Sequence, residues 1–297
     1  MGESTLATAG PEGSAVGLEV SAVERGAPTT APRAPAGLPF AVEEHRLEVV
    51  QLDLFEASPH LLVLGDAGCG KSSLLRLVAN GLAARHPPDE VALVIVDPRR
   101  GLLDLTALPN LVGYAYSITT VIQAVDQLRR EFEERSAGFE LLPAPSMPAL
   151  APAGASLALV QASNQVGPLM GPHHVVLVDD YDLLPGDGGS PLLPLLDLLG
   201  LGRELGFHLV LTRRVAGAAR AAFEPVVQRL RELGGSGLVM SGDPGEGPLL
   251  GGQRAAALPP GRGFLVRPPA PPTLVQVAYR PPPATSRPAG GRSAWGG

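Results

Sequence analysis

Residues 65–72 combine three glycines, a lysine and a serine at a spacing that suits phosphate chemistry. The segment fits the Walker A pattern G-x-x-x-x-G-K-[ST] at every fixed position. Glycines leave room for a phosphate and let backbone N–H groups point into an anion nest at a helix N-terminus. Lys71 would supply a point charge for the β- and γ-phosphate oxygens, and the Ser72 hydroxyl would ligate Mg²⁺. The alternative is a glycine-rich turn that merely happens to hold a lysine and a serine.

The segments on either side supply the context that this pattern needs. Residues 61–64 form a short apolar run, typical of a strand buried on both faces, and apolar residues recur at helical spacing over 74–82. Strand, loop and helix therefore follow one another, and we predict that the loop binds a nucleotide. The predicted nucleotide-binding residues are Gly65, Asp66, Ala67, Gly68, Cys69, Gly70, Lys71, Ser72 and Ser73. We assign no chemistry to the cysteine.

Two acids follow another apolar run. Residues 175–178 precede Asp179 and Asp180, which is the Walker B pattern. A carboxylate at a strand end beside a phosphate loop can hold Mg²⁺, so we predict that Asp179 shares the metal with Ser72. Asp180 stands where many such ATPases carry a glutamate that polarises the attacking water, and it could serve in that way or cap the following turn. Apolar strands often end in Asp, so the pattern is specific only downstream of a complete Walker A motif.

Polar residues also end the apolar runs at 91–96 and 208–211, where Asp97 and Thr212 follow. Ligands of open α/β sheets bind at the carboxyl ends of the strands, so both residues could face the site, with Thr212 contacting the γ-phosphate or its water. The alternatives are a solvated corner at Asp97 and a hydrogen-bonded strand end at Thr212. Solvated side chains are expected for Arg99 and Arg100.

The elements that must position these residues alternate along the chain. Four apolar runs are separated by segments of helical periodicity, which is typical of a mainly parallel α/β sheet with helices on both faces. The predicted helices lie within 74–82, 117–135, 191–205 and 215–233. A short fifth strand is expected over 238–240, and a C-terminal β-hairpin over 263–267 and 273–278. Residues 47–54 are predicted to form an edge strand or a surface hairpin.

Composition limits the organisation of the chain. With 297 residues, 45% of them hydrophobic, it can bury one sizeable core, and its single cysteine excludes an internal disulfide. The net charge of −6 argues against a protein that coats nucleic acid, and no apolar run approaches the ~20 residues of a membrane span. We expect a disordered leader or linker over 1–37, a folded domain over 38–280 with a Pro/Ala-rich insert at 138–172, and a disordered tail over 281–297.

Six segments together carry a resemblance to a known family: residues 59–66, 96–100, 178–182, 206–214, 242–249 and 259–263. On these residues the chain resembles the ATPase domains of the FtsK/SpoIIIE type, and most closely the C-terminal ATPase module of the EccC proteins of type VII secretion systems. The Walker A motif alone would identify only a superfamily, whereas the later segments are more specific.

The resemblance implies a RecA-like P-loop NTPase fold in which the strand before Thr212 lies between the P-loop strand and the Walker B strand. It implies ATP and Mg²⁺ as ligands. It assigns Lys71 to the phosphates, Asp180 to the catalytic acid position and Thr212 to a γ-phosphate sensor. It assigns the metal to Ser72 and Asp179.

The resemblance also implies partners. EccC-like proteins carry several such modules behind a membrane anchor and are thought to form hexamers. The expected partners are other EccC-type modules and small helical-hairpin secretion substrates, with a cytoplasmic location at the inner face of the plasma membrane through partner subunits. The insert lacks the Trp-rich segment usual before the Walker B strand, and the chain has one P-loop and no anchor, so we expect a fragment, a split subunit or a stand-alone relative.

Three functions are compatible with these residues. The first is an ATPase module of a type VII secretion motor, and the second is an FtsK-like DNA translocase, against which the acidic balance and the lack of a basic reading head argue. The third is an ATP-binding module that docks substrates without hydrolysis, since Asp180 replaces the usual glutamate. An arginine finger is expected among four candidates: Arg100, Arg203, Arg213 and Arg220.

Overall fold

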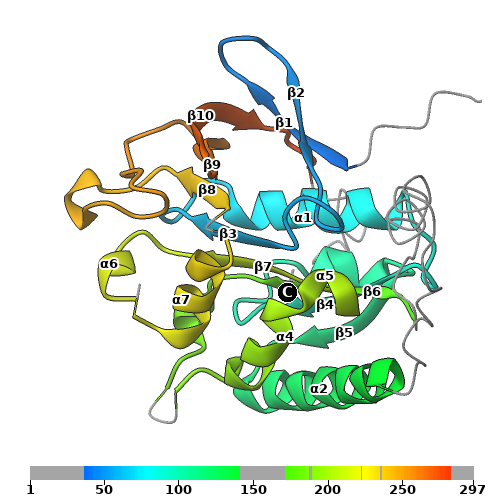
Figure 1. Ribbon diagram of the computed structural model, residues 1–297. Helices are drawn as coiled ribbons and strands as arrows, with labels where there is room; N and C mark the ends of the chain where they lie inside the picture. The colour runs from blue at the N-terminus through cyan, green and yellow to red at the C-terminus, as the bar shows by residue number, and fades with distance from the viewer. Residues whose placement is uncertain (1–36, 141–170, 187–188, 222, 235, 282–297) are drawn as a thin grey trace, which may run out of the picture. The chain divides into compact units, whose positions relative to one another are not determined.

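The computed structural model describes residues 37–140, 171–186, 189–221, 223–234 and 236–281. These residues form a ten-stranded sheet in the order β2-β1-β10-β9-β8-β3-β7-β6-β4-β5 (Figure 1). The strands are β1 (Leu38–Glu43), β2 (Val49–Leu52), β3 (His60–Leu64), β4 (Val91–Val96), β5 (Leu111–Ala115), β6 (His173–Val178), β7 (Phe207–Arg213), β8 (Gly237–Met240), β9 (Arg262–Arg267) and β10 (Ala270–Val277). The predicted leader, most of the insert and the tail lie outside the described residues.

The sheet has a parallel and an antiparallel half. Strands β8, β3, β7, β6, β4 and β5 run parallel to one another. Strands β9, β10, β1 and β2 continue the sheet in antiparallel pairs. The C-terminal hairpin β9–β10 is therefore confirmed, and β7 lies between β3 and β6 as the resemblance implies. Both interpretations of residues 47–54 hold in part, because β1 and β2 form a hairpin whose second strand is the edge of the sheet.

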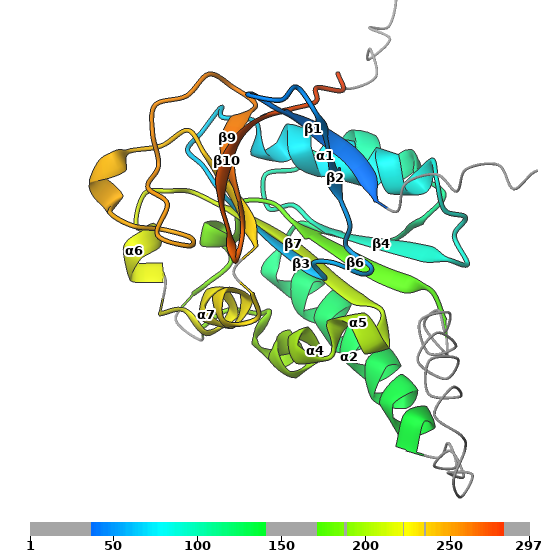
Figure 2. The same ribbon diagram turned by 45° about the horizontal axis from the view of Figure 1, so that its top comes forward.

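Helices cover both faces of the parallel half. They are α1 (Lys71–Ala83), α2 (Ile118–Glu140), α4 (Leu196–Gly200), α5 (Gly202–Leu205), α6 (Ala218–Ala221) and α7 (Pro225–Glu232). Four short 3₁₀ helices join them: η1 (Leu103–Ala107), η2 (Tyr181–Leu183), η3 (Leu193–Leu195) and η4 (Pro244–Glu246). Figures 1 and 2 show α1 on one face of the sheet, with α2, α4, α5 and α7 on the other.

The strand sequences dictate this layering. Alternate side chains of a strand point to opposite faces, so a strand covered on both sides must be apolar throughout. In β3, Leu61 and Val63 pack in the core that contains α1, whereas Leu62 and Leu64 pack in the core that contains α2 and α7. The continuous apolar run predicted at this position thus fills two cores at once.

Three parts of the chain differ from the prediction. Strand β5 was not predicted, because Gly113 and the exposed Val112 interrupt its apolar pattern at the edge of the sheet. The single helix predicted over 191–205 is instead η3, α4 and α5, a stretch interrupted by glycine and proline. The helix predicted over 215–233 is divided into α6 and α7, and α7 begins at Pro225, since proline is compatible with a first turn but not with a helix interior.

Candidate nucleotide-binding site

The loop between β3 and α1 has the conformation that its glycines permit. Gly68 and Gly70 have φ angles of 76° and 113°, in the left-handed region that other residues rarely adopt. Gly65 is required for space, since a Cβ there would lie 2.5 Å from Cys69 Sγ. The N–H of Gly261 donates to the Cys69 carbonyl oxygen at 2.7 Å and so holds the loop from outside. The loop leads directly into the N-terminus of α1, where an anion is favoured.

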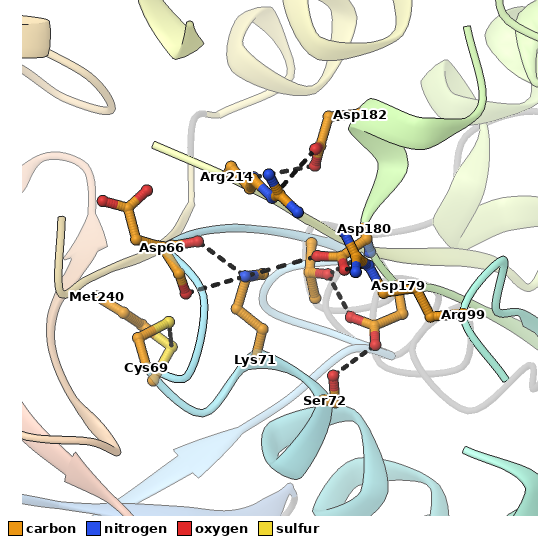
Figure 3. Close-up of polar contacts among 12 residues, drawn as sticks. Asp66, Cys69, Lys71, Ser72, Arg99, Asp179, Asp180, Asp182, Arg214 and Met240 are labelled. Atoms are coloured by element: carbon orange, nitrogen blue, oxygen red, sulfur yellow. Dashed lines mark hydrogen bonds and ion pairs between the residues drawn. The ribbon is translucent and has the colours of Figure 1, made fainter. Parts of the chain in front are cut away.

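The ammonium group of Lys71 is buried against this loop. It donates to the carbonyl oxygens of Gly65 at 2.8 Å and Asp66 at 3.2 Å, and it lies 3.6 Å from Asp180 Oδ1 (Figure 3). Two neutral oxygens and one carboxylate therefore hold one cation. A phosphate oxygen could replace the carboxylate at this cation without a change in the position of the lysine stem.

The Walker B acid meets the Walker A serine. Ser72 Oγ donates to Asp179 Oδ2 at 2.5 Å, although the serine belongs to α1 and the acid follows β6. Burial raises the pKa of the Asp179 carboxyl group, hydrogen bonds from Ser72 and Thr212 lower it, and the charges of Asp180 and Asp97 raise it further. A hydroxyl and a carboxylate from separate segments thus meet at the N-terminus of α1, next to Lys71.

Thr212, at the end of β7, stands between the two acids. Its Oγ1 donates to Asp179 Oδ1 at 2.7 Å and accepts a hydrogen bond from the Asp180 N–H at 3.0 Å. The side chain is fully buried. The single hydroxyl proton is used on Asp179, so the threonine orients the acids, and its contact with a γ-phosphate stays a prediction.

Asp180 occupies an unusual backbone conformation, with φ 45° and ψ 56° in the left-handed region. Its side chain makes no capping hydrogen bond to η2, so the capping alternative is not found. Instead the carboxylate lies between two cations, 3.6 Å from Lys71 Nζ and 2.6 Å from Arg99 Nε. Arg99 is exposed, as expected, but it also forms this ion pair, because the arginine and the acid follow neighbouring strands, β4 and β6, which pair only in the folded sheet.

Asp97 is close to the site but organises a turn. It is fully buried, and its Oδ2 accepts hydrogen bonds from the Leu102 N–H at 2.7 Å and the Tyr114 hydroxyl at 2.6 Å. Burial and the hydrogen bond to Asp97 raise the pKa of Tyr114, which keeps the phenol protonated as a donor. The solvated corner is therefore not found, and Asp97 fixes the loop that carries Arg99.

The remaining loop residues differ in their surroundings. Ala67 and Gly68 are exposed, whereas Asp66 and Ser73 are half-buried. Cys69 is buried with its Sγ 3.9 Å from Met240 Sδ, and burial raises the pKa of its thiol. Its contacts are those of a packing residue, in agreement with the absence of any chemistry assigned to it.

Two of the four finger candidates have partners within the described part of the chain. Arg213 is buried, and its Nη1 lies 3.6 Å from Glu224 Oε1. The guanidinium carbon of Arg100 lies 4.2 Å from the centroid of the Tyr116 ring. The guanidinium of Arg213 is therefore buried within this chain.

The donor set suits Mg²⁺. Ser72 Oγ and Asp179 Oδ2 are hard oxygen ligands in direct contact. Within the described ranges, no group of three or more His, Cys, Asp or Glu side chains is arranged to hold a metal ion. An ion bound here would take few protein ligands, as Mg²⁺ does when substrate phosphates complete its coordination. These two residues would hold it.

A family model described as the FtsK/SpoIIIE family matches residues 20–185. The chain belongs to the FtsK/SpoIIIE family. Among curated relatives, the ESX-4 secretion system protein EccC4 of Mycobacterium tuberculosis is 41% identical over 244 residues, which cover 82% of this chain and 18% of the relative. The ESX secretion system protein EccC of Thermomonospora curvata is 37% identical over 243 residues, 82% of this chain and 17% of the relative. The chain thus spans less than a fifth of the length of these relatives.

Solved structures of this family have the same fold. The cytoplasmic domain of the Thermomonospora curvata type VII secretion ATPase EccC matches with a TM-score of 0.70 and 36% identity, over 84% of this chain and 28% of that chain. ATPases 2 and 3 of the same EccC, in complex with a signal sequence peptide, match with a TM-score of 0.70 and 37% identity, over 83% and 41%. The predicted resemblance to EccC-type ATPase modules and the RecA-like P-loop NTPase fold are confirmed.

Two residues of this FtsK/SpoIIIE site were missed from the sequence. Arg99 carried a signal, since it follows a buried strand at the ligand edge of the sheet, but its partner is distant in the chain. Gly261 lies in the segment 259–263 that carries the resemblance, but nothing local indicated its role, which is a backbone hydrogen bond to a loop nearly two hundred residues earlier. Across the described ranges, every helix is too short or too polar to span a membrane.

Proposed function

We propose that the chain is an ATP-binding, Mg²⁺-dependent ATPase module of a type VII protein secretion motor. The observation that carries the proposal is the 2.5 Å contact between Ser72 Oγ and Asp179 Oδ2. It joins the hydroxyl of a phosphate loop to a carboxylate from another strand, which is the arrangement that a nucleotide-bound Mg²⁺ requires. The similarity to EccC proteins supports the assignment to secretion.

The side chains have separable roles in this proposal. Bound Mg²⁺ would neutralise charge on the β- and γ-phosphates. Lys71 binds the same phosphate oxygens, exchanging its contact with the Asp180 carboxylate for them. Asp180 orients the attacking water and accepts its proton. Thr212 keeps one oxygen of Asp179 occupied, so the other faces Ser72 and the metal.

The proposal extends to assembly and location. Other EccC-type modules, in a hexameric assembly, would complete the motor. The EccC structure in complex with a signal sequence peptide supports secretion substrates with such signals as partners, and we include the small helical-hairpin substrates expected from the sequence. The module would act in the cytoplasm, at the inner face of the plasma membrane through partner subunits.

Lys71 is the only lysine in the sequence, which allows a direct test. We expect Lys71→Ala to weaken binding of a fluorescent ATP analogue about 10- to 100-fold, because a charge-assisted contact to phosphate is lost. Isotope labelling of lysine gives one side-chain NMR resonance, which should move when Mg²⁺ and ATP are added to the wild type. Arg129→Ala on α2 is the control and should bind as the wild type does.

Two outcomes would redirect the proposal. Wild-type affinity in Lys71→Ala would contradict the nucleotide site itself. Tight binding without turnover, even when the chain is mixed with sister EccC modules, would indicate a module that docks substrates without hydrolysis.

A further inference from the structure

The carboxylate of Asp180 has two cationic partners of different kinds. Lys71 Nζ lies 3.6 Å from Oδ1, and Arg99 Nε lies 2.6 Å from Oδ2. The lysine side chain is 7% exposed and the acid 13%, whereas the arginine is 49% exposed. The shorter contact is therefore made by the residue that reaches in from the surface (Figure 3).

The turn that presents Arg99 is fixed on several sides. Asp97 anchors it through the Leu102 N–H, and Arg76 donates from α1 to the Gly101 carbonyl oxygen at 2.8 Å and to Asp104 Oδ2 at 2.7 Å. Arg76 belongs to the helix that begins at the phosphate loop. The turn and the loop are thus held at a set distance, and Arg99 can approach Asp180 without reorganisation of the backbone.

The two cations contact different oxygens of the Asp180 carboxylate, and the 3.6 Å Lys71 contact is longer than a hydrogen bond. A carboxylate and a phosphate are alternative anionic partners for the same ammonium, so an Asp180 side chain that settles on Lys71 would oppose nucleotide binding. Arg99, at 2.6 Å on the far oxygen, limits how closely the acid can approach the lysine, which stays at 3.6 Å. We propose that Arg99 is a positioning residue that keeps Asp180 from closing onto Lys71, so that phosphate can replace this longer contact and the acid stays aimed at the attacking water. This role rests on the proposed nucleotide site.

The expected effect is moderate because Arg99 is half-exposed and water screens its charge. Arg99→Ala should weaken binding of the Mg²⁺-loaded fluorescent ATP analogue roughly three- to tenfold. Arg99→Lys should restore the affinity to within about twofold, since it keeps a cation at the position. The matched control is Arg129→Ala, which removes an arginine of similar exposure, 51%, paired with Glu133 on α2, and should change nothing.

A double-mutant cycle separates action through Asp180 from direct contact with nucleotide. In the Asp180→Asn background, Arg99→Ala should cause no further loss of affinity. The same loss in that background would overturn the proposal, because Arg99 would then act on the nucleotide itself. Equal affinity of the wild type and Arg99→Ala would overturn it as well.

A second measurement needs no nucleotide, so it distinguishes failure of this proposal from failure of the proposed function. In the protein without nucleotide, Arg99→Ala should shift the single lysine resonance, as the carboxylate moves onto the Lys71 ammonium, and Asp180→Asn should cancel the shift. An unmoved resonance would contradict the role of Arg99. Unimpaired ATP binding by Lys71→Ala would instead contradict the nucleotide site. The effect of Arg99 on the contact between Lys71 and Asp180 would then be tested only by the shift of the lysine resonance.

Discussion

At the carboxyl ends of β3, β7 and β6, charged groups meet one another, whereas at the amino ends of the same strands imidazole rings meet an aromatic ring. The carboxyl edge holds Lys71, Asp179 and Asp180 in mutual contact or bridged by hydroxyls. At the amino edge, His173 Nδ1 lies 2.8 Å from His208 Nε2. The same sheet therefore supports two polar clusters of opposite character.

The imidazole pair at the amino edge packs against Phe55. The ring of Phe55 lies 4.3 Å from that of His173 and 5.2 Å from that of His208, centroid to centroid. Burial lowers the pKa of His173 to about 4 and also lowers that of His208. Both rings are neutral near pH 7, so they contribute packing and hydrogen bonds.

The difference shows that buried polar side chains are kept charged at the edge where a ligand is expected and are neutral in the imidazole pair at the opposite edge. Charges at the carboxyl edge are costly to bury and are retained in close pairs, as expected where phosphate and metal would complete the partnerships. The His173–His208 pair at the amino edge is instead buried as two neutral rings. Mutations at one edge should therefore leave the measurements of the other edge unchanged.

The largest effect is expected from Asp180→Asn. Loss of the proposed general base should reduce ATP turnover at least about 100-fold, while binding of the ATP analogue is kept or strengthened, because the amide does not compete for Lys71. Steady-state phosphate release and equilibrium binding, measured on the same sample, check both parts. His173→Phe at the other edge is the control and should keep wild-type turnover. Retained turnover in Asp180→Asn would contradict the proposed role of Asp180 as the general base.

A smaller effect is expected from Asp179→Asn. The change should remove most of the Mg²⁺ dependence of ATP binding, about 10- to 100-fold in affinity, since the amide is a poor metal ligand. The thermal midpoint without nucleotide should change little, because the amide removes a buried charge but can accept only one of the two hydroxyl hydrogen bonds. Titration with the ATP analogue, with and without Mg²⁺, measures the first part. An undiminished Mg²⁺ effect would mean that other residues hold the ion.

The smallest effect concerns stability against acid. The folded pKa of His173 is about 4 and its ordinary value is 6.5, so between these values the unfolded chain binds a proton that the folded chain does not. The free energy of unfolding should therefore fall as the pH drops from 6.5 toward 4, by about 1–2 kcal/mol after allowance for partial exposure of the ring. His173→Phe should flatten this fall in urea unfolding at pH 7 and pH 5, whereas His45→Gln, at an exposed position, should not. An unchanged slope in His173→Phe would assign the acid sensitivity elsewhere.

The fold was predictable from the sequence where the signal is local. The runs that become β3, β4, β6 and β7 are apolar throughout because two cores must be filled. The Walker A glycines are required by the positive φ angles of Gly68 and Gly70 and by the approach of Cys69 to Gly65. Strand β5 was not predictable in this way, because Gly113 and the exposed Val112 interrupt its apolar run. The glycine and proline at Gly202 and Pro225 indicate that a helix could be interrupted there. The helical periodicity of the apolar residues nevertheless favoured single helices over 191–205 and 215–233.

The sequence predicted which residues lie at the strand ends that form the site, but it did not predict which side chains pair with one another. Asp179 and Thr212 could be assigned to the ligand edge because parallel strands end there together. The partners of Arg99 and Asp97 depend on which strands are neighbours and on how turns close. Arg99 and Asp97 lie only two residues apart but differ in their surroundings. Arg99 pairs with an acid that follows a neighbouring strand, whereas Asp97 is buried beneath a turn.

The hydrogen bond from Gly261 to the Cys69 carbonyl has a consequence for the order in which the protein assembles. Gly261 follows every strand of the parallel half, so a chain emerging from the ribosome can pair all six of those strands before the phosphate loop gains its last backbone partner. A nascent chain that stops short of residue 261 carries the full Walker A sequence without the completed loop. The capacity to hold nucleotide would therefore mature late in synthesis, after the sheet that supports it.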